Sequence, residues 1–367
     1  MIKAPFGGEL RIVELSNEGF KTIEIKNNIF DPELKNKQEL KKVLTGESAL
    51  NQNNVLQVLR KNKLIVEKPM GDDISSFNFS RRAFQDREWN SVTVRARGLF
   101  VDTTDGSIIA RSYDKFFNHR EIEATKSDTL NNNLKYPVTA YLKENGFLGM
   151  ISYNHKNDDF FIASKSTNKG PYVEYIKKIF FSMSLDFDQI KAYLKENKVT
   201  LVFEVIDPIN DPHMIEYDKP TMYLLDIIKN EYVFSKLPYK ELYDFAMNYG
   251  FRPKILFDEF KTWDGIYSLL HEIEENYDYV WKGVPIEGLV FEDANGFMFK
   301  KKSGFYGFWK HMRGVKETYA KGRVVNLAGL FNARSNYFYG WLKTLDKEYV
   351  LSKSIIELRK EYERTKI

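Results

Sequence analysis

The chain has 367 residues, of which 43% are hydrophobic, so it is long enough to form one large or two medium domains around a sizeable core. The 55 basic and 51 acidic side chains nearly balance, which excludes a histone-like polycation and means that any nucleic-acid contact must come from local clusters of charge. The absence of cysteine excludes disulfides, cysteine-rich zinc sites and a cysteine nucleophile.

The N-terminal sequence lacks the apolar core of a signal peptide, and no stretch reaches about eighteen uncharged apolar residues. We therefore expect a cytoplasmic protein without a membrane-spanning helix. Residues 1–90 have a mixed pattern, in which 31–43 and 47–59 indicate short helices.

From residue 91 onward the pattern favours strands. The alternating, β-branched stretch 92–101 predicts a strand, Asp105-Gly106 predicts a turn, and 107–111 predicts the returning strand. Further strands are predicted at 138–143, 147–153 and 159–163.

Helices and strands are mixed in the middle of the chain. Apolar spacing predicts helices at 172–183, 187–197, 239–249 and 263–277, and strands at 199–206 and 221–228. A hairpin is predicted for 286–292 and 296–301, and helices for 303–319, 336–345 and 347–364. We therefore predict an α+β fold of largely antiparallel sheets flanked by helices over 1–302, followed by an all-helical domain over 303–367.

The most informative motif is Lys143-Glu144-Asn145-Gly146, in which a lysine ends one strand and a turn leads into the next. Such a lysine can lie at the floor of a groove between sheets, although a solvent-exposed lysine in an ordinary hairpin is the commoner outcome for so short a motif.

Charged residues in later strands give this motif more weight. Glu204 lies within an apolar strand and Glu287 begins another, and a buried carboxylate is costly unless it is paired. Lys300 and Lys302 lie on one strand face by alternation, where two like charges repel unless they share an anion such as a phosphate.

The order of these motifs resembles that of the covalent nucleotidyltransferases, the superfamily of ATP-dependent ligases and mRNA capping enzymes. Upstream, Arg95-Ala96-Arg97-Gly98 and Lys115-Phe116-Phe117-Asn118 are similar to the RNA ligase 1 family, which includes a phage enzyme and the ligase domain of fungal tRNA ligases. Most of the superfamily has aspartate where this chain has Asn145, and the fungal branch tolerates asparagine there. The resemblance covers roughly residues 95–302.

The resemblance implies a nucleotidyltransferase core and an RNA ligase that joins 5′-phosphate and 3′-hydroxyl ends in tRNA repair or splicing. Lys143 would attack the α-phosphorus of ATP and carry AMP, which would pass to an RNA 5′-phosphate before sealing. Because only a neutral amine is a nucleophile, we expect Lys300 and Lys302, together with partial burial, to lower the pKa of Lys143.

The other site residues follow from the same resemblance. Glu204 and Glu287 would hold a hydrated Mg²⁺ or Mn²⁺, or the ribose. The ATP-binding set would comprise Arg97, Lys115, Gly146, Lys165, Glu204, Tyr223, Glu287, Lys300 and Lys302. Tyr223 could stack on adenine or simply pack within the sheet.

Three alternatives remain open on the sequence. The chain could be a DNA ligase, a capping-type nucleotidyltransferase, or a non-catalytic RNA-binding relative. The first two carry a β-barrel after the last motif, whereas the residues after Lys302 favour helices. We expect a monomer that acts on RNA with broken ends, tRNA in particular, and a separate end-healing kinase and phosphatase as partners.

Overall fold

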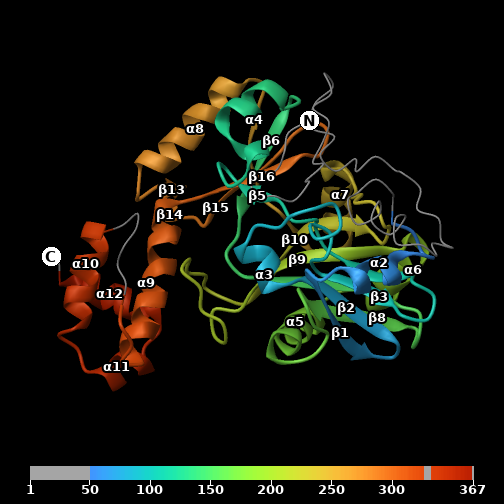
Figure 1. Cartoon of the computed structure of the whole chain (residues 1–367), viewed down its shortest axis with the longest axis horizontal. Helices are drawn as coiled ribbons and strands as arrows, with labels where there is room; N and C mark the ends of the chain where they lie inside the picture. Colours follow the sequence, from blue (N-terminus) through green and yellow to red (C-terminus); the bar gives the residue numbers. More distant parts are fainter. Residues whose placement is uncertain (1–49, 326–331, 366–367) are drawn as a thin grey trace.

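The structure is a computed structural model that describes residues 50–325 and 332–365 (Figure 1). Its strands are β1 (Ile65–Gly71), β2 (Ile74–Phe79), β3 (Leu99–Asp102), β4 (Ile108–Arg111), β5 (Phe117–Asn118), β6 (Val138–Lys143), β7 (Phe147–Asn154), β8 (Asp159–Ser164), β9 (Val199–Ile206), β10 (Thr221–Lys229), β11 (Arg252–Pro253), β12 (Leu256–Phe260), β13 (Val280–Trp281), β14 (Val284–Pro285), β15 (Gly288–Glu292) and β16 (Met298–Lys302). Its α-helices are α2 (Val55–Lys61), α3 (Arg81–Gln85), α4 (Ser127–Asn133), α5 (Pro171–Phe181), α6 (Phe187–Asn197), α7 (Tyr239–Tyr249), α8 (Trp263–Glu275), α9 (Gly304–Ala320), α10 (Asn332–Leu342), α11 (Lys347–Ser352) and α12 (Ile355–Arg364).

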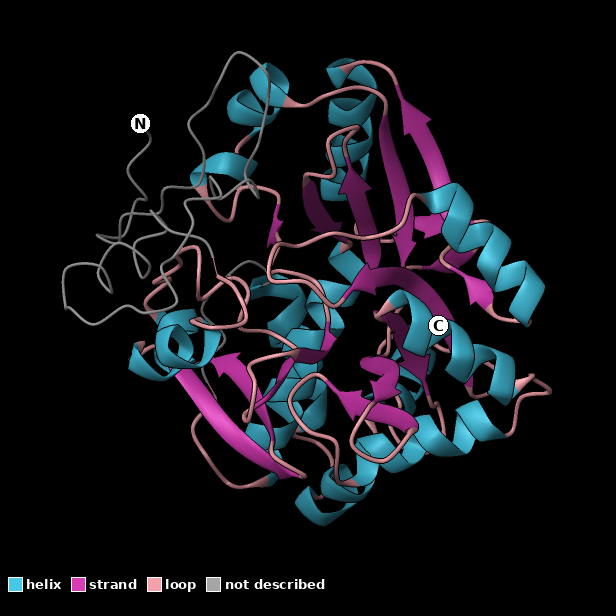
Figure 2. Ribbon diagram, turned by 90° about the vertical axis from the view of Figure 1, so that its right-hand side faces the viewer, coloured by secondary structure: helices cyan, strands magenta, loops and turns pink. Residues whose placement is uncertain are grey.

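Two five-stranded sheets form the centre of the molecule (Figure 2). The β9 sheet has the strand order β11-β10-β9-β7-β8, and the β6 sheet has the order β12-β6-β15-β16-β5. The turn 144–146 connects β6 directly to β7 and therefore passes from one sheet to the other. A side chain at the end of β6 is thus placed where the two sheets meet.

Apolar side chains cover both faces of the β9 sheet. Every residue of β9 is buried, as expected for a strand that is apolar apart from Thr200 and Glu204. One face packs against α5, α6 and α7, whereas Met150 and Val202 on the other face pack with Phe100 of β3. The β6 sheet is covered by α4 and α8, whose Leu130 and Leu270 share a core with the strands.

A buried ionic cluster links the two sheets. Asp226 of β10 is fully buried, accepts a hydrogen bond from Tyr113, and pairs with Lys236 at 3.1 Å and Lys254 at 3.0 Å. Lys236 also pairs at 2.8 Å with Glu292 of β15 in the other sheet. These ion pairs therefore hold the β9 sheet and the β6 sheet together.

Replacing Asp226 with alanine is expected to lower the free energy of unfolding by about 3–5 kcal/mol, because two buried ammonium groups lose their shared carboxylate. Denaturant titration followed by circular dichroism measures the loss. Asp244→Ala, which removes an exposed partner of Lys240, is the control and should leave stability almost unchanged. Equal stability of the two variants would contradict this view of the cluster.

The C-terminal helices α9–α12 form a cluster with its own apolar core, which includes Trp309, Met312, Phe338 and Leu358 (Figure 1). Ser303 caps α9 directly after β16, and its hydroxyl accepts a hydrogen bond from the backbone N–H of Tyr306. None of the helices in the described parts of the chain is long and apolar enough to cross a lipid bilayer.

The predicted fold class is confirmed, and most predicted elements agree with the observed ones to within a few residues. Three predictions are wrong in detail. Residues 92–95 form turns instead of strand, residues 50–54 of the helix predicted at 47–59 are not helical because α2 begins at Val55, and the helix predicted at 347–364 is interrupted and forms α11 and α12. The hairpin of β1 and β2 has no counterpart among the predicted elements. The helix predicted at 31–43 lies outside the described residues.

Candidate functional site

Lys143 is the last residue of β6 and points to the junction of the two sheets. Its Nζ lies 2.9 Å from Oε1 of Glu287 and 4.0 Å from Oε1 of Glu204. The pairing register explains the first contact, since β15 runs antiparallel to β6 and Lys143 lies opposite Gly288. The side chain of Lys143 is 21% exposed and belongs to the lining of a cavity.

The carboxylates beside Lys143 change its protonation equilibrium. Burial alone would lower the pKa of Lys143, but Glu287 and Glu204 together outweigh burial and raise the pKa above its ordinary value. Lys302 pairs with Glu287 at 3.0 Å. The prediction that Lys300 and Lys302 lower the pKa of Lys143 is therefore wrong for the ligand-free chain, because the carboxylates lie closer to the amine.

The same two glutamates hold the turn that follows Lys143. The Gly146 N–H donates a hydrogen bond of 2.9 Å to Glu204, and the Asn145 side-chain amide donates one of 2.8 Å to Glu287. A Cβ atom on Gly146 would lie 2.1 Å from the carbonyl oxygen of Val205, so only glycine fits this close approach. The asparagine in place of aspartate thus donates to a carboxylate, which an ionised aspartate could not do.

A cluster of cations lies beside Lys143. Lys300 is half-buried, and burial together with Lys115, Arg97, Lys143 and Lys302 lowers its pKa well below the ordinary value. Its Nζ donates a hydrogen bond of 3.3 Å to the carbonyl oxygen of Phe116. Grouping of like charges in a partly desolvated place is unfavourable unless an anion binds, so the cluster has the character of a phosphate site.

Lys115 and Lys165 lie on the outer side of this cluster. Burial is the main cause that lowers the pKa of Lys115 to about 8, and Arg97 and Lys165 contribute. Lys115 pairs with Glu121 at 3.3 Å, and its Nζ lies 3.7 Å from the centre of the Phe117 ring. Lys165 is exposed, and its Nζ lies 5.2 Å from the centre of the Phe79 ring.

Arg97 completes the cluster from the loop before β3. Burial lowers the pKa of its guanidinium, and Glu204 opposes this effect. Within residues 50–325 and 332–365, no hydrogen bond or ion pair engages its guanidinium. A bidentate donor is therefore available for an anion that enters the groove.

A cavity of about 220 Å³ opens beside Lys143. Three aromatic side chains, Tyr217, Tyr223 of β10 and Trp281 of β13, belong to its lining, together with Ile286 and Glu287. Tyr223 lies opposite Glu204 in the β9 sheet. The cavity therefore combines flat apolar surfaces with the amine and one of the two carboxylates.

The donor set is compatible with a hydrated divalent cation. The described residues contain no group of three or more His, Cys, Asp or Glu side chains that could hold a metal. Glu204 and Glu287 both flank the same amine, and Mg²⁺ prefers one or two carboxylates with its other positions filled by water and phosphate. The residues present thus fit such an ion and do not form a dedicated protein cage.

The predicted site residues are linked by contacts in the structure. Glu204 and Glu287 flank Lys143, Lys302 pairs with Glu287, Gly146 bonds Glu204, and Tyr223 lines the cavity beside Lys143. Lys300, Arg97 and Lys115 form the cationic cluster, with the exposed Lys165 beside Lys115.

Trp281 and Tyr217 also line the cavity, although neither belongs to the predicted site residues. Tyr217 Oη accepts a hydrogen bond of 2.8 Å from Asn145 N–H and donates one of 2.6 Å to Glu144. Both lie in irregular or very short segments, where no periodic pattern marks a functional residue.

A family model described as "RNA ligase" matches residues 95–306 of the chain. Curated relatives include a "tRNA ligase" of Candida albicans, 28% identical over 272 residues, and a "tRNA ligase 1" of Schizosaccharomyces pombe, 25% identical over 319 residues. These matches cover 64% and 77% of this chain but 32% and 40% of the relatives. The chain thus spans less than half the length of the curated relatives that it matches.

Solved structures with a similar fold include two forms of an archaeal ATP-dependent RNA ligase. They align with TM-scores of 0.51 and 0.50 at 13% and 12% identity, and each match covers 89% of this chain and 81% of the other. At this level of identity the likeness concerns the fold, namely two sheets with flanking helices.

Proposed function

The chain belongs to the RNA ligase family, and on that premise we propose that it is an ATP-dependent RNA ligase, which joins an RNA 5′-phosphate to an RNA 3′-hydroxyl through lysyl-AMP and RNA-adenylate intermediates. The observation that carries the proposal is the amine of Lys143, which lies between two carboxylates and beside Lys300, a half-buried cation whose pKa is lowered by burial and by the cations around it.

In the first step, the neutral amine of Lys143 attacks the α-phosphorus of ATP. A nitrogen–phosphorus bond forms, the bond from the α-phosphorus to pyrophosphate breaks, and the amine loses its proton. Lys300, Arg97 and Lys115 neutralise the charge of the departing pyrophosphate, which is the main electrostatic task in this chemistry. Glu287 orients the amine, because it lies 2.9 Å from Nζ.

We assign Glu204 and Glu287 to a hydrated Mg²⁺ or Mn²⁺. When bound, the ion offsets the charge of the triphosphate. The adenine base would occupy the cavity beside Lys143, where Tyr223 and Trp281 offer surfaces for stacking. Lys302 balances Glu287, and Lys165 at the edge of the groove would contact the outer phosphates.

Two carboxyl groups next to one amine give the reaction a defined pH dependence. Because they raise the pKa of Lys143, the rate of lysyl-AMP formation at low ATP should rise about tenfold per pH unit near neutrality. In Glu287→Gln the nearer carboxylate is gone and the pKa falls, so the profile should move to lower pH even though the maximal rate falls.

Single-turnover measurements of adduct formation between pH 5.5 and 9.5 test this expectation. Glu274→Gln is the matched control, because Glu274 pairs with Lys301 on the outer side of the strand. A Glu287→Gln profile that coincides with the wild-type profile would contradict the assigned role of the carboxylate.

We propose broken tRNA as the substrate, since the fungal relatives are named tRNA ligases. Ligation requires a 5′-phosphate and a 3′-hydroxyl, so a separate kinase and phosphatase would prepare the ends. We further propose that the protein acts as a cytoplasmic monomer and divides into an adenylyltransferase domain up to Lys302 and a C-terminal helical domain.

Incubation of the chain with each labelled nucleoside triphosphate and Mg²⁺, followed by denaturing electrophoresis, tests the function. We expect an acid-labile adduct with ATP and sealing of a broken tRNA anticodon loop. An adduct with GTP alone would favour a capping-type enzyme, sealing of nicked DNA alone would favour a DNA ligase, and RNA binding without an adduct would favour a non-catalytic relative.

A further inference from the structure

The turn 144–146, which directly follows Lys143, forms hydrogen bonds on two sides. On one side, Gly146 and Asn145 bond Glu204 of β9 and Glu287 next to β15. The connection between β9 and β10 (residues 207–220) holds it from the other side, where Tyr217 Oη bonds both Asn145 N–H and Glu144. In addition, the backbone N–H of Ile215 donates a hydrogen bond of 3.1 Å to the Asn145 side chain.

The neighbouring residues of the same connection face the C-terminal helices. Met214 is buried in the apolar core of α9–α12, and its carbonyl oxygen accepts a hydrogen bond of 2.7 Å from Arg359 of α12. Glu216 pairs at 2.5 Å with both Arg359 and Lys360. Met214 and Glu216 thus contact the C-terminal helices, whereas Ile215 and Tyr217 contact the turn 144–146, which we call the nucleophile turn.

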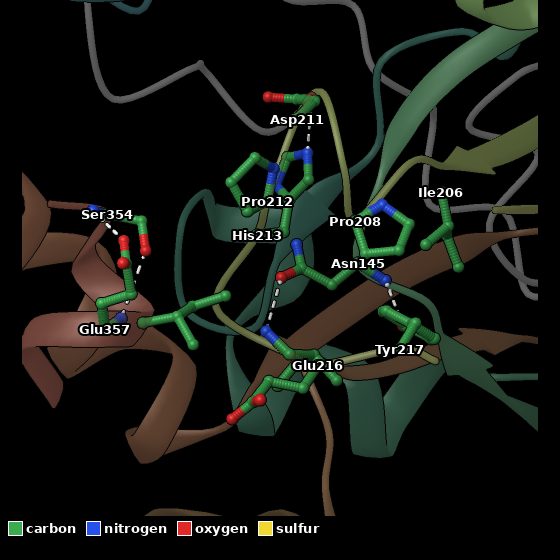
Figure 3. A pocket seen from close by; sticks show the side chains of 12 residues that line it. Asn145, Ile206, Pro208, Asp211, Pro212, His213, Glu216, Tyr217, Ser354 and Glu357 are labelled. Atoms are coloured by element: carbon green, nitrogen blue, oxygen red, sulfur yellow. Dashed lines mark hydrogen bonds and ion pairs between the residues drawn. The ribbon is translucent and has the colours of Figure 1, made fainter. Parts of the chain in front are cut away.

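Figure 3 shows this junction, with Asn145 and Tyr217 on one side and Ser354 and Glu357 of α12 on the other. A cavity of about 360 Å³ lies there, and Ile215, Glu216 and Tyr217 of the 214–217 segment belong to its lining. Arg359 is well placed to fix it, because its side chain is only 7% exposed and lies 5.0 Å from the centre of the Phe305 ring.

We propose that Arg359 is a positioning residue for lysyl-AMP formation, which acts through the 214–217 segment on the turn that follows Lys143. The proposal rests on the proposed function of Lys143. Arg359 does not reach the reacting atoms, and docking of the C-terminal helices would thereby set how well the nucleophile turn is ordered. A displacement of the amine by a fraction of an ångström is enough to slow an attack that requires alignment with the leaving group.

The test compares two steps of one reaction. Lysyl-AMP formation needs an ordered Lys143, whereas sealing of an RNA that is already adenylylated does not need the free amine. At saturating ATP, Arg359→Gln and Tyr217→Phe should each slow adduct formation about tenfold or more, with a much smaller effect on sealing of pre-adenylylated RNA. Lys343→Gln is the control, because it removes a cation of the same helical region whose described contact is with the Tyr339 ring.

The double variant shows whether Arg359 acts on the nucleophile turn through Tyr217 or independently of it. If Arg359 acts through Tyr217, Arg359→Gln/Tyr217→Phe should be no slower than the slower single variant, whereas independent effects would multiply. Should Arg359→Gln not fold, Glu216→Gln gives the same test with little change in packing, because it removes the partly exposed negative charge that pairs with Arg359.

Wild-type rates for Arg359→Gln or Glu216→Gln, equal losses in both steps, or multiplying effects would overturn the inference. The proposed function is tested separately on the wild-type chain, by whether that chain forms an adduct with ATP and seals broken RNA.

Discussion

Replacing Lys143 with alanine is expected to abolish formation of the lysyl-AMP adduct and, with it, sealing of RNA from ATP. Alanine has no nucleophile, and the neighbouring Lys300 and Lys302 are held by the Phe116 carbonyl and by Glu287. The same variant should still seal an RNA that has been adenylylated beforehand, because that step requires only the RNA 3′-hydroxyl and the bound adenylate. Transfer of label from α-³²P-ATP to protein measures the first effect.

Lys229→Ala is the matched control for this experiment, since Lys229 also ends a strand of the central sheets but lies at the far end of β10 from Tyr223. It should form the adduct at the wild-type rate. An alanine variant at Lys143 that still accepts AMP would show that another residue is the nucleophile.

Replacing Lys300 with methionine is expected to slow adduct formation by about 10²–10³-fold, the usual effect of removing one charged donor from a developing anion. The reason is the position of Lys300 within the cationic cluster, where Arg97 and Lys115 are close enough to lower its pKa. Methionine keeps the length and the apolar stem of lysine, so the variant should fold. Single-turnover kinetics at several ATP concentrations measures the loss.

Lys301 offers a control one residue away. It lies on the other face of β16, where it pairs with Glu274 at 3.0 Å. Lys301→Met should therefore keep the wild-type rate within a small factor. Equal losses in the two variants would mean that the strand matters only for folding, and that the cluster is not a phosphate site.

Much of the fold could be predicted from local patterns. The strand that ends in Lys143, the buried β9 and the helices α6 and α7 have the boundaries that their apolar spacing indicates. The errors also have local causes. The Asn90 side chain accepts hydrogen bonds from the backbone N–H groups of Val92 and Thr93, which turns a stretch with strand-like alternation into a loop.

A similar competition divides the last helix. Ser354 and Glu357 form a capping box, which starts α12 anew after α11. The hairpin of β1 and β2 turns at Gly71, Asp72 and Asp73, all with positive φ, and a Gly-Asp-Asp sequence of this kind is a local signal for such a turn.

The site could be predicted only in part. Lys143, Glu204 and Glu287 are recognisable because charged residues stand out at the ends or in the middle of apolar strands. Their mutual distances depend on the pairing of β15 with β6, which joins residues far apart in the sequence. For the same reason the pKa of Lys143 could not be predicted, since its direction depends on whether a carboxylate or an ammonium group lies nearer.

The contacts of Tyr217 and Arg359 lay beyond sequence analysis altogether. Tyr217 belongs to an irregular connection, and Arg359 reaches Met214 across 145 positions of the chain. Such contacts depend on how the C-terminal helices pack against the rest of the molecule, which no local pattern encodes.

Peptide mapping of the protein–AMP adduct tests the central claim most directly. After incubation with ATP and Mg²⁺, mass spectrometry of proteolytic fragments should find AMP on the peptide that contains Lys143 and on no other lysine. AMP attached to Lys300, Lys302 or any residue other than Lys143, or the absence of any modified peptide, would contradict the assignment of Lys143 as the nucleophile.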